Sequence, residues 1–166
     1  MPKKKNILDF AFDLQLFANQ STYSFTDVTA TISHPNYGSY SIQGEGIGDM
    51  TITKATDRSV HDVAADGSIM TSKIAGNNGS VAINAQQTSS LHEFLQGMFN
   101  YLWQADTSEW AQISCTIEAP KMGKSFYCTG GAFIKEPDEP FQSQGQRVAW
   151  TLLFADIQRI QLTGTH

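Results

Sequence analysis

Two neighbouring runs of alternating apolar and polar residues, at 111–119 and 126–134, do most to restrict how this chain can fold. Side chains of a strand point alternately to its two faces, so each run presents one apolar face. The apolar positions are Ala111, Ile113, Cys115, Ile117 and Ala119, then Phe126, Cys128, Gly130, Ala132 and Ile134. A turn near Lys121–Met122 places residue 117 opposite 126 and Cys115 opposite Cys128. The pattern therefore predicts an antiparallel hairpin with one core-facing side.

Similar alternation predicts strands along most of the chain after residue 20. The further strands are expected at 28–32, 40–42, 50–52 and 147–157. The last of these places four apolar side chains on one face: Val148, Trp150, Leu152 and Phe154. A second hairpin is predicted over 68–87, with its loop at "AGNNGS", because Asn and Gly tolerate the positive φ of hairpin loops.

One segment has helical rather than strand periodicity. Six apolar residues recur at helical spacing, namely Leu91, Phe94, Leu95, Met98, Phe99 and Leu102. Ser90 and Glu93 resemble a capping box, and the helix is expected to end between 103 and 106. We expect the apolar stripe to pack on the subunit's own sheet, with His92 at the surface or at its boundary. The fold class is therefore mainly β, a sandwich or barrel with one flanking helix.

The charge of the chain limits its partners. The net charge of the 166 residues is −5, and charged residues make up only 16%, against roughly 25% in an average domain. The first twenty residues contain three lysines and two aspartates, so the remainder has a net charge of −6. This disfavours tight nucleic-acid binding but allows a surface past which nucleic acid slides. Two cysteines are too few for a disulfide framework, and we expect buried thiols.

The opening segment "KKKNILDFAFDLQLFANQ" begins like an export signal but does not continue as one. A signal peptide needs about 7–15 uninterrupted apolar residues, and Asp9, Asp13 and Gln15 break this run. The segment is also a poor membrane anchor. Four side chains share one helical face: Ile7, Phe10, Leu14 and Phe17. We therefore expect 1–20 to be an arm that docks on a neighbouring subunit or ring through Phe10, Leu14 and Phe17, ahead of a β domain at 21–166. A disordered, cleaved or vestigial leader is the alternative.

No set of residues typical of catalysis stands out. The four histidines lie at none of the spacings expected of zinc ligands. The acidic pairs fall in expected loops without a partner for acid–base chemistry. We therefore expect no enzyme, no metal site and no cofactor.

The strands between 38 and 86 are unusually polar yet uncharged. Such strands suit a wall between a thin core and a water-filled channel, and their long edges invite pairing between copies of the chain. Closure into a ring leaves no free edge. The candidate channel or ring-contact residues are Ser39, Ser41, Gln43, Thr51, Thr53, Ser72 and Asn84. An ordinary two-sided sheet is the alternative interpretation.

The order of these segments resembles the tail tube proteins of contractile-tailed bacteriophages and related prophage particles. The resemblance covers about 21–162 and rests on four parts of the chain. They are "YSFTDVTATI" at Tyr23–Ile32, "DGSIMTSKIAGNNGSVAI" at Asp66–Ile83, "LHEFLQGMFNY" at Leu91–Tyr101, and "WTLLF" at Trp150–Phe154. No single part is diagnostic, and their order and spacing carry the resemblance.

The resemblance implies a structural virion protein whose fold is related to the tubes of type VI secretion. Six copies would form a ring, and stacked rings would form a hollow tube for DNA passage into the host. The implied partners are other copies of the chain, a sheath protein, a baseplate and a tail terminator, with no membrane anchor. The protein would be made in the host cytoplasm and reside in the virion tail.

One feature departs from the family pattern. The arm's "DLQLFA" resembles the openings of phage structural proteins, capsid proteins especially, so another virion component such as a tail terminator or capsid-associated protein is a rival. A monomeric β domain that binds sugars or small ligands through Tyr37, Tyr40 and Trp110 is a second rival. Ring size in purified particles distinguishes a tail tube protein from another virion component. A melting temperature that shifts with ligand would favour the ligand-binding domain.

Overall fold

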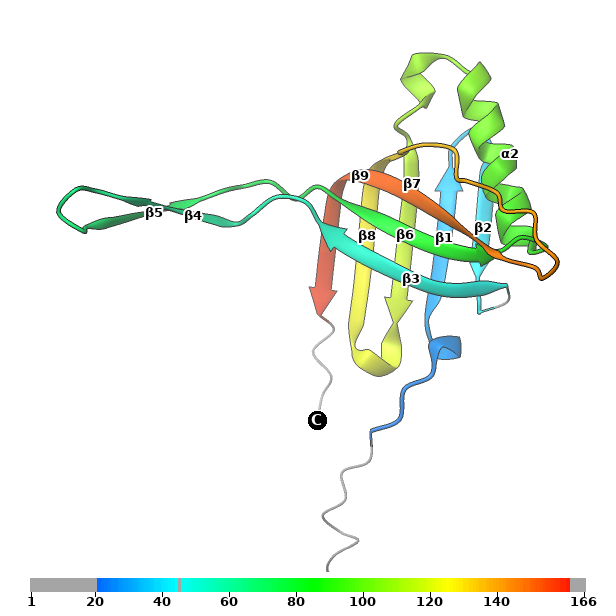
Figure 1. The fold of residues 1–166 in the computed structure, drawn as a ribbon, viewed down its shortest axis with the longest axis horizontal. Coiled ribbons are helices and arrows are strands. Elements are labelled where there is room, and N and C mark those ends of the chain that lie inside the picture. Colours follow the sequence, from blue (N-terminus) through cyan, green and yellow to red (C-terminus); the bar gives the residue numbers. More distant parts are fainter. Residues whose placement is uncertain (1–20, 45, 162–166) are drawn as a thin grey trace, which may run out of the picture.

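The computed structural model describes residues 21–44 and 46–161 and consists of one large sheet, one long helix and a separate two-stranded ribbon (Figure 1). The large sheet has the strand order β2-β1-β7-β8-β9-β6-β3, with every neighbouring pair antiparallel. Its strands are β1 (Thr29–His34), β2 (Gly38–Ile42), β3 (Ile47–Lys54), β6 (Gly79–Gln86), β7 (Ile113–Ala119), β8 (Lys124–Phe133) and β9 (Arg147–Gln161). The mainly β fold class is thereby confirmed.

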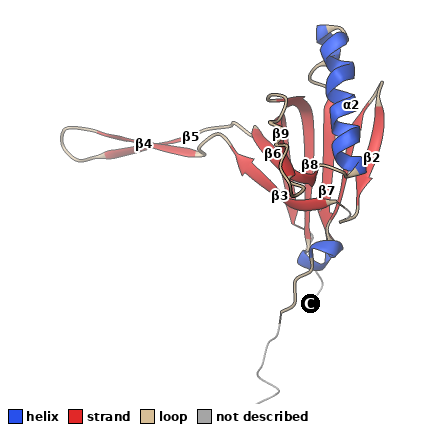
Figure 2. Ribbon diagram, turned by 45° about the vertical axis from the view of Figure 1, so that its right-hand side comes forward, coloured by secondary structure: helices blue, strands red, loops and turns tan. Residues whose placement is uncertain are grey.

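The sheet folds over on itself because β9 is long enough to belong to two layers. Its first half pairs with β6, from Gln86 opposite Arg147 to Gly79 opposite Phe154. Its second half pairs with β8, as far as Lys124 opposite Gln161. One layer is therefore β2-β1-β7-β8, and the other is β9-β6-β3, which crosses in front of it (Figure 1). The core lies between the layers, and helix α2 (Ser90–Gln104) covers an open side (Figure 2).

The apolar faces predicted from the sequence meet in this core. Ile32, Ile83, Trp150 and Leu152 are fully buried, as period-two alternation requires of core-facing strand positions. Trp150 lies at the centre of an aromatic cluster, with ring centroids 5.3 Å from Phe133 and 6.4 Å from Phe99. The core face of β9 is thus confirmed.

Helix α2 packs as its apolar stripe predicts. Leu91, Leu95, Met98 and Leu102 are buried, while Phe94 and Phe99 pack against the core from a half-buried position. The helix ends at Gln104, within the expected range. The predicted cap was wrong by one residue: Ser89 is the N-cap, and its hydroxyl accepts a hydrogen bond from the backbone N–H of His92 (3.2 Å). A serine pair offers two equivalent caps, and the local chain path decides between them.

The hairpin β7–β8 has the predicted register up to one bulge. Ile117 lies opposite Phe126 and Cys115 opposite Cys128, but Ile113 lies opposite Gly131. The extra residue on β8 and the positive φ of Gly130 (+64°) form a bulge that reverses the alternation. Phe133 is therefore buried, whereas the predicted core residue Ile134 is exposed. The expected position of Ala111 in the first strand was also wrong, because β7 begins at Ile113 and Ala111 is exposed.

The second hairpin was predicted with the wrong pair of strands. Residues 69–73 pair with 59–63 rather than with the strand after "AGNNGS". The turn is at Asp66–Gly67, where the carboxylate of Asp66 accepts hydrogen bonds from the backbone N–H (3.0 Å) and hydroxyl (2.7 Å) of Ser68. Gly67 has a φ of +85°, which other residues rarely adopt. This turn joins its two strands through a tighter connection than the predicted six-residue loop "AGNNGS" would.

The two cysteines are buried thiols that face each other across β7 and β8. Burial raises the pKa of both, that of Cys128 to about 11. The thiols of the unfolded chain ionise at about pH 9 while those of the folded chain stay protonated, so the free energy of unfolding falls as pH rises. We expect a loss of about 2 kcal/mol between pH 8 and pH 10 in urea unfolding. Cys128→Ala should flatten this slope, and an unchanged slope in the variant would contradict the assignment.

Candidate assembly surfaces

The most exposed part of the molecule is a ribbon formed by β4 (Ser59–Val63) and β5 (Ile69–Lys73). It projects away from the sheet and helix (Figure 1), and every residue in both strands is exposed. Four large apolar side chains on it are 49–64% exposed: Val60, Val63, Ile69 and Met70. An isolated two-stranded ribbon is at best marginally stable in water. The ribbon is therefore a candidate surface for contact with another protein.

The ribbon's apolar residues lie on both of its faces. Val63 pairs with Ile69 at the tip, and both belong to one face. Val60 pairs with Ser72 and Met70 with Asp62, and these four belong to the other face. Apolar groups on both faces suit a ribbon inserted between two partners rather than laid on one.

Polar contacts fix the direction in which the ribbon leaves the body. The side-chain oxygen of Asn77 accepts hydrogen bonds from Lys54 Nζ (2.8 Å) and Arg58 Nη2 (2.5 Å), and its amide donates to Asp156 (2.5 Å). The hydroxyl of Thr56 donates to the Asn78 side chain (2.5 Å). The two segments that connect the ribbon to β3 and β6 are thus linked to each other and to β9.

The candidate channel residues do not form one cluster. Five of them lie on sheet faces that point away from the core, and they divide between the two layers. Ser39 and Ser41 belong to β2, while Thr51, Thr53 and Asn84 belong to β3 and β6. Gln43 follows the end of β2, and Ser72 lies on the projecting ribbon.

The outward face of β9-β6-β3 is lined with small polar side chains. Thr51 lies opposite Ala82 and Thr53 opposite Ser80, and Ala82 in turn lies opposite Thr151 of β9. The amide of Asn84 donates to the carboxylate of Asp49 (2.6 Å). Among the described residues, β3 pairs only with β6, so its other edge has free backbone groups.

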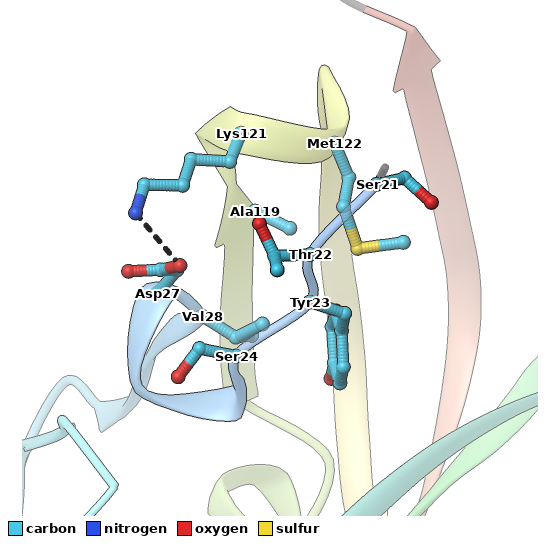
Figure 3. Close-up of a pocket in the computed structure, with 9 residues that line it drawn as sticks. All are labelled: Ser21, Thr22, Tyr23, Ser24, Asp27, Val28, Ala119, Lys121 and Met122. Carbon is cyan, nitrogen blue, oxygen red and sulfur yellow. Dashed lines mark ion pairs between the residues drawn. The ribbon is translucent and has the colours of Figure 1, made fainter. Parts of the chain in front are cut away.

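An apolar groove, here called the mouth, opens between β3 and the ends of β7, β8 and β9. Its volume is about 370 Å³, and its lining includes Val28, Met50, Ile52, Ile117 and Phe126. A smaller hollow of about 280 Å³ adjoins it and shares Tyr23, Val28, Ala119 and Met122 with it (Figure 3).

Basic side chains stand at the rim of the mouth. Lys121 Nζ lies 2.9 Å from a carboxylate oxygen of Asp27 (Figure 3). Lys124 also lines the mouth, and the guanidinium of Arg159 lies over the Phe126 ring, 5.8 Å from its centroid. The mouth is therefore an apolar groove with a positive margin.

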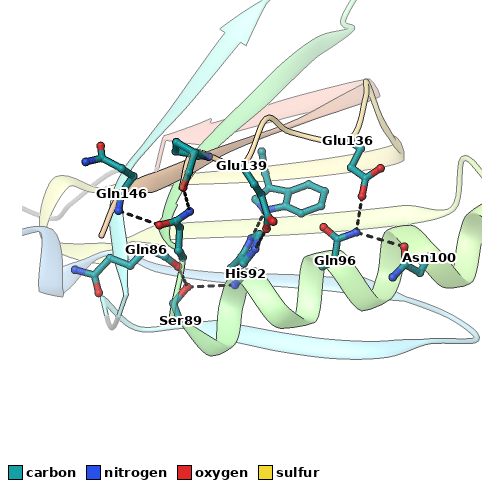
Figure 4. Close-up of polar contacts among 11 residues, drawn as sticks. Gln86, Ser89, His92, Gln96, Asn100, Glu136, Glu139 and Gln146 are labelled. Atoms are coloured by element: carbon teal, nitrogen blue, oxygen red, sulfur yellow. Dashed lines mark hydrogen bonds and ion pairs between the residues drawn. The ribbon is translucent and has the colours of Figure 1, made fainter. Parts of the chain in front are cut away.

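His92, which was expected at the surface or at its boundary, is instead buried, and this prediction was wrong. The indole N–H of Trp150 can only donate, so His92 Nδ1 accepts from it (3.0 Å). The opposite nitrogen, Nε2, then carries the proton and donates to Glu139 (2.6 Å) (Figure 4). His92 thus joins the core to residues 134–146, a strap between β8 and β9.

The rest of the strap is held to the helix end by amide side chains (Figure 4). Gln96 donates to Glu136 (2.8 Å), and Gln87 donates to the Pro140 carbonyl (2.6 Å). The backbone N–H of Gln146 donates to the side-chain oxygen of Gln87 (3.0 Å). The strap is therefore a fixed part of the subunit surface.

We expect His92→Leu to lower the free energy of unfolding by about 1–3 kcal/mol, because the buried Trp150 N–H loses its acceptor. Urea unfolding measures this. Glu93→Leu, at the exposed neighbouring position, is the control and should cost less than half as much. Equal effects of the two substitutions would argue against the hydrogen bond.

The three aromatic residues considered for ligand binding, Tyr37, Tyr40 and Trp110, pack against aromatic side chains of α2. The ring centroid of Phe94 lies 5.4 Å from that of Tyr37 and 5.2 Å from that of Tyr40. Trp110 packs edge-on against Phe99. All three are half-buried, so they form no open platform for a ligand. In the part of the chain that the structure describes, no group of His, Cys, Asp and Glu could hold a metal, and no helix is long and apolar enough to cross a bilayer.

A family model described as Bacteriophage PhiTE tail tube protein matches residues 20–162. The chain belongs to this family. The resemblance inferred from the sequence is thereby confirmed, and the chain is a tail tube-type structural protein of the virion tail. The comparison with curated protein sequences finds no match.

Solved structures with the tail tube-type fold come from contractile particles. A chain of the anti-feeding prophage baseplate is 11% identical (TM-score 0.56) and covers 87% of this chain and 99% of its own. A chain of the cap that terminates the tube of the same particle is 6% identical (TM-score 0.54; 87% and 94% covered). A chain of the sheath–tube complex of an extracellular contractile injection system, PVC, is 6% identical (TM-score 0.52; 89% and 97% covered). These likenesses establish the shared fold.

The projecting ribbon was not predicted from the sequence. Its apolar residues do not follow the alternation of a half-buried strand, because Val60 and Val63 are three positions apart and Ile69 and Met70 are adjacent; the Asp66–Gly67 turn was the available signal. The arm residues Phe10, Leu14 and Phe17 lie outside the described residues.

Proposed function

We propose that this chain is the major subunit of a tail tube. Six copies close into a ring, and rings stack into a hollow tube through which DNA passes into the host. The observation that carries the proposal is the β4–β5 ribbon, which exposes apolar side chains on both faces and extends beyond its own subunit. A ribbon of this kind is stable only when neighbouring copies cover it. Ser72 is then a contact residue.

The wall of the channel is the outward face of β9-β6-β3. Thr51, Thr53 and Asn84 face the lumen, and the free edge of β3 continues into the neighbouring copy. Hydroxyl and amide groups stay hydrated without holding phosphates, and a net charge of −5 further disfavours binding. DNA therefore slides past. Ser39, Ser41 and Gln43, in the other layer, lie at contacts with neighbouring subunits or rings.

The partners of the tube are a sheath, a baseplate and a tail terminator. Support comes from the similar structures, which include a baseplate, a cap and a sheath–tube complex. The outer surface of each ring includes the exposed side of α2, opposite the core. The chain is made in the host cytoplasm and acts by assembly, without catalytic residues or a cofactor.

Negative-stain microscopy of the purified chain over a concentration series, with sizing alongside, tests the function. Rings or stacked tubes with a central hole are the expected result. A tail initiator is added where the chain alone stays monomeric. A monomer at every concentration, with and without the initiator, would contradict the proposal.

We expect Thr51→Lys combined with Thr53→Lys to leave tubes intact but to reduce DNA delivery about tenfold or more. Each of the six copies in a ring would add two cations to the channel wall. The phosphates of the passing DNA would bind to them. The measurement is the infectivity of particles assembled from the variant chain, with tubes counted by microscopy.

Glutamate at the same two positions is the matched control. Its side chain is comparable in length but repels phosphates, so delivery should stay close to normal. Equal loss with lysine and glutamate would place Thr51 and Thr53 at a subunit contact instead of the channel.

A further inference from the structure

The two open sides of the folded sheet differ in how well the core is covered. On one side α2 covers the core, and Leu91, Leu95 and Met98 are fully buried beneath it. On the other side the mouth leaves Val28, Met50 and Phe126 only half-buried. Tyr23 and Met122 at its margin are 66% and 48% exposed. Within residues 21–44 and 46–161, no amphipathic element covers the mouth as the helix covers the opposite side.

The chain contains one further amphipathic segment, residues 7–17. Ile7, Phe10, Leu14 and Phe17 recur at helical spacing, which gives the segment one apolar face. Its only charged residues are Asp9 and Asp13. Two basic side chains, Lys124 and Arg159, line the mouth, while Lys121 lines the adjoining hollow and is paired with Asp27. The apolar face fits the lining of the mouth, and the aspartates fit its margin.

We infer that the mouth is the docking site for residues 7–17 of a neighbouring copy. This inference rests on the proposed self-assembly, and it names the surface that receives the arm. Phe10, Leu14 and Phe17 enter the groove floored by Met50, Ile52 and Phe126. The arm then caps the neighbour's core much as α2 caps the other side.

The path of the described chain points to a neighbour rather than to the chain's own mouth. From Val28 back to Ser21 the chain runs along the rim and reaches Met122, beside the tip of the β7–β8 hairpin (Figure 3). Residues 18–20 span at most about 10 Å. A return into the same groove would need a reversal within these three residues. The short tether limits docking to surfaces near Ser21, including the mouth of a copy packed beside this rim, and many copies in a ring give such docking a high effective concentration.

Disulfide trapping in mixtures tests the inference. One batch of the full chain has Leu14→Cys and the other has Met50→Cys, so a bond between these positions can form only between two copies. The native thiols are buried, and peptide mass spectrometry identifies the linked pair. Thr53→Cys replaces Met50→Cys in the control mixture, because Thr53 is on the same strand but faces away from the core.

We expect a covalent dimer in oxidised tubes from the Leu14–Met50 mixture, and at least tenfold less from the Leu14–Thr53 mixture. Tubes seen by microscopy without the Leu14–Met50 bond would overturn the docking site and leave the proposed function standing. A bond that forms only in a single chain carrying both substitutions would place the arm in its own mouth and also overturn the inference. If neither tubes nor bonds form, even with the initiator, both proposals fail.

A second measurement does not depend on cysteine chemistry. Phe10→Ser with Phe17→Ser should raise the concentration needed for half-maximal tube formation about tenfold or more. Gln15→Ser with Asn19→Ser, in the same arm but off its apolar face, should leave that concentration unchanged. Tubes that stack normally with both phenylalanines replaced would contradict the inference.

Discussion

Replacing Val63 and Ile69 with aspartate is expected to abolish tube formation while leaving the subunit folded. The two residues pair at the tip of the β4–β5 ribbon and are 64% and 61% exposed. They contribute nothing to the subunit's core, so the melting temperature should change little. In a tube they would be buried, and two carboxylates there would lose hydration without gaining partners. Microscopy should show no tubes at ten times the concentration that suffices for the unaltered chain.

The control for this experiment adds a single carboxylate away from the tip. Ser59→Asp lies at the base of the same ribbon, where the side chain is already polar and exposed. It should reduce assembly far less than the double substitution. If the double variant still forms tubes, the ribbon is not an assembly contact, and another surface must hold the copies together.

Trp150→Ala should lower the free energy of unfolding by about 3–5 kcal/mol, enough to unfold a large share of a marginally stable subunit. Trp150 is fully buried, and its ring packs against Phe133, Phe99 and His92. Its removal opens a cavity where both layers and the helix meet. It also leaves His92 Nδ1 without its donor. Urea unfolding followed by far-UV circular dichroism measures the loss.

Trp103→Ala supplies the same change of side chain at an exposed position. Trp103 is 73% exposed, and its ring lies near those of Phe99 and Trp110, which are only half-buried. It should cost under about 1 kcal/mol. Similar losses at the two positions would mean that the core does not centre on Trp150.

The parts of the fold that the sequence predicted are those where two independent patterns agree. Cys115 could be placed opposite Cys128 because two alternating runs and one turn admit a single register that joins their apolar faces. The apolar stripe from Leu91 to Leu102 was predicted equally well, because helical spacing and a serine cap indicate the same helix. The bulge at Gly130 was hidden, because Ala132 and Ile134 continue the alternation that the bulge reverses.

The projecting ribbon was harder to predict for a physical reason. The alternation of residues 69–73 indicates a strand but does not say which other strand pairs with it. Residues 69–73 were therefore paired with the strand after "AGNNGS" instead of with 59–63. The buried His92 was also missed, since its place depends on an indole N–H from Trp150, 58 positions along the chain.

The position of β9 has a consequence for how and when the subunit can form. It is the last described strand in chain order, yet it pairs with β8 on one side and β6 on the other. A chain still being synthesised can form the local pairs β1–β2 and β7–β8 but cannot join the two layers. Closure must wait until β9 pairs with β6, residues 79–86 with 147–154, which is a non-local contact and therefore slow to form. Chains that end before β9 therefore lack the strand that joins the two layers.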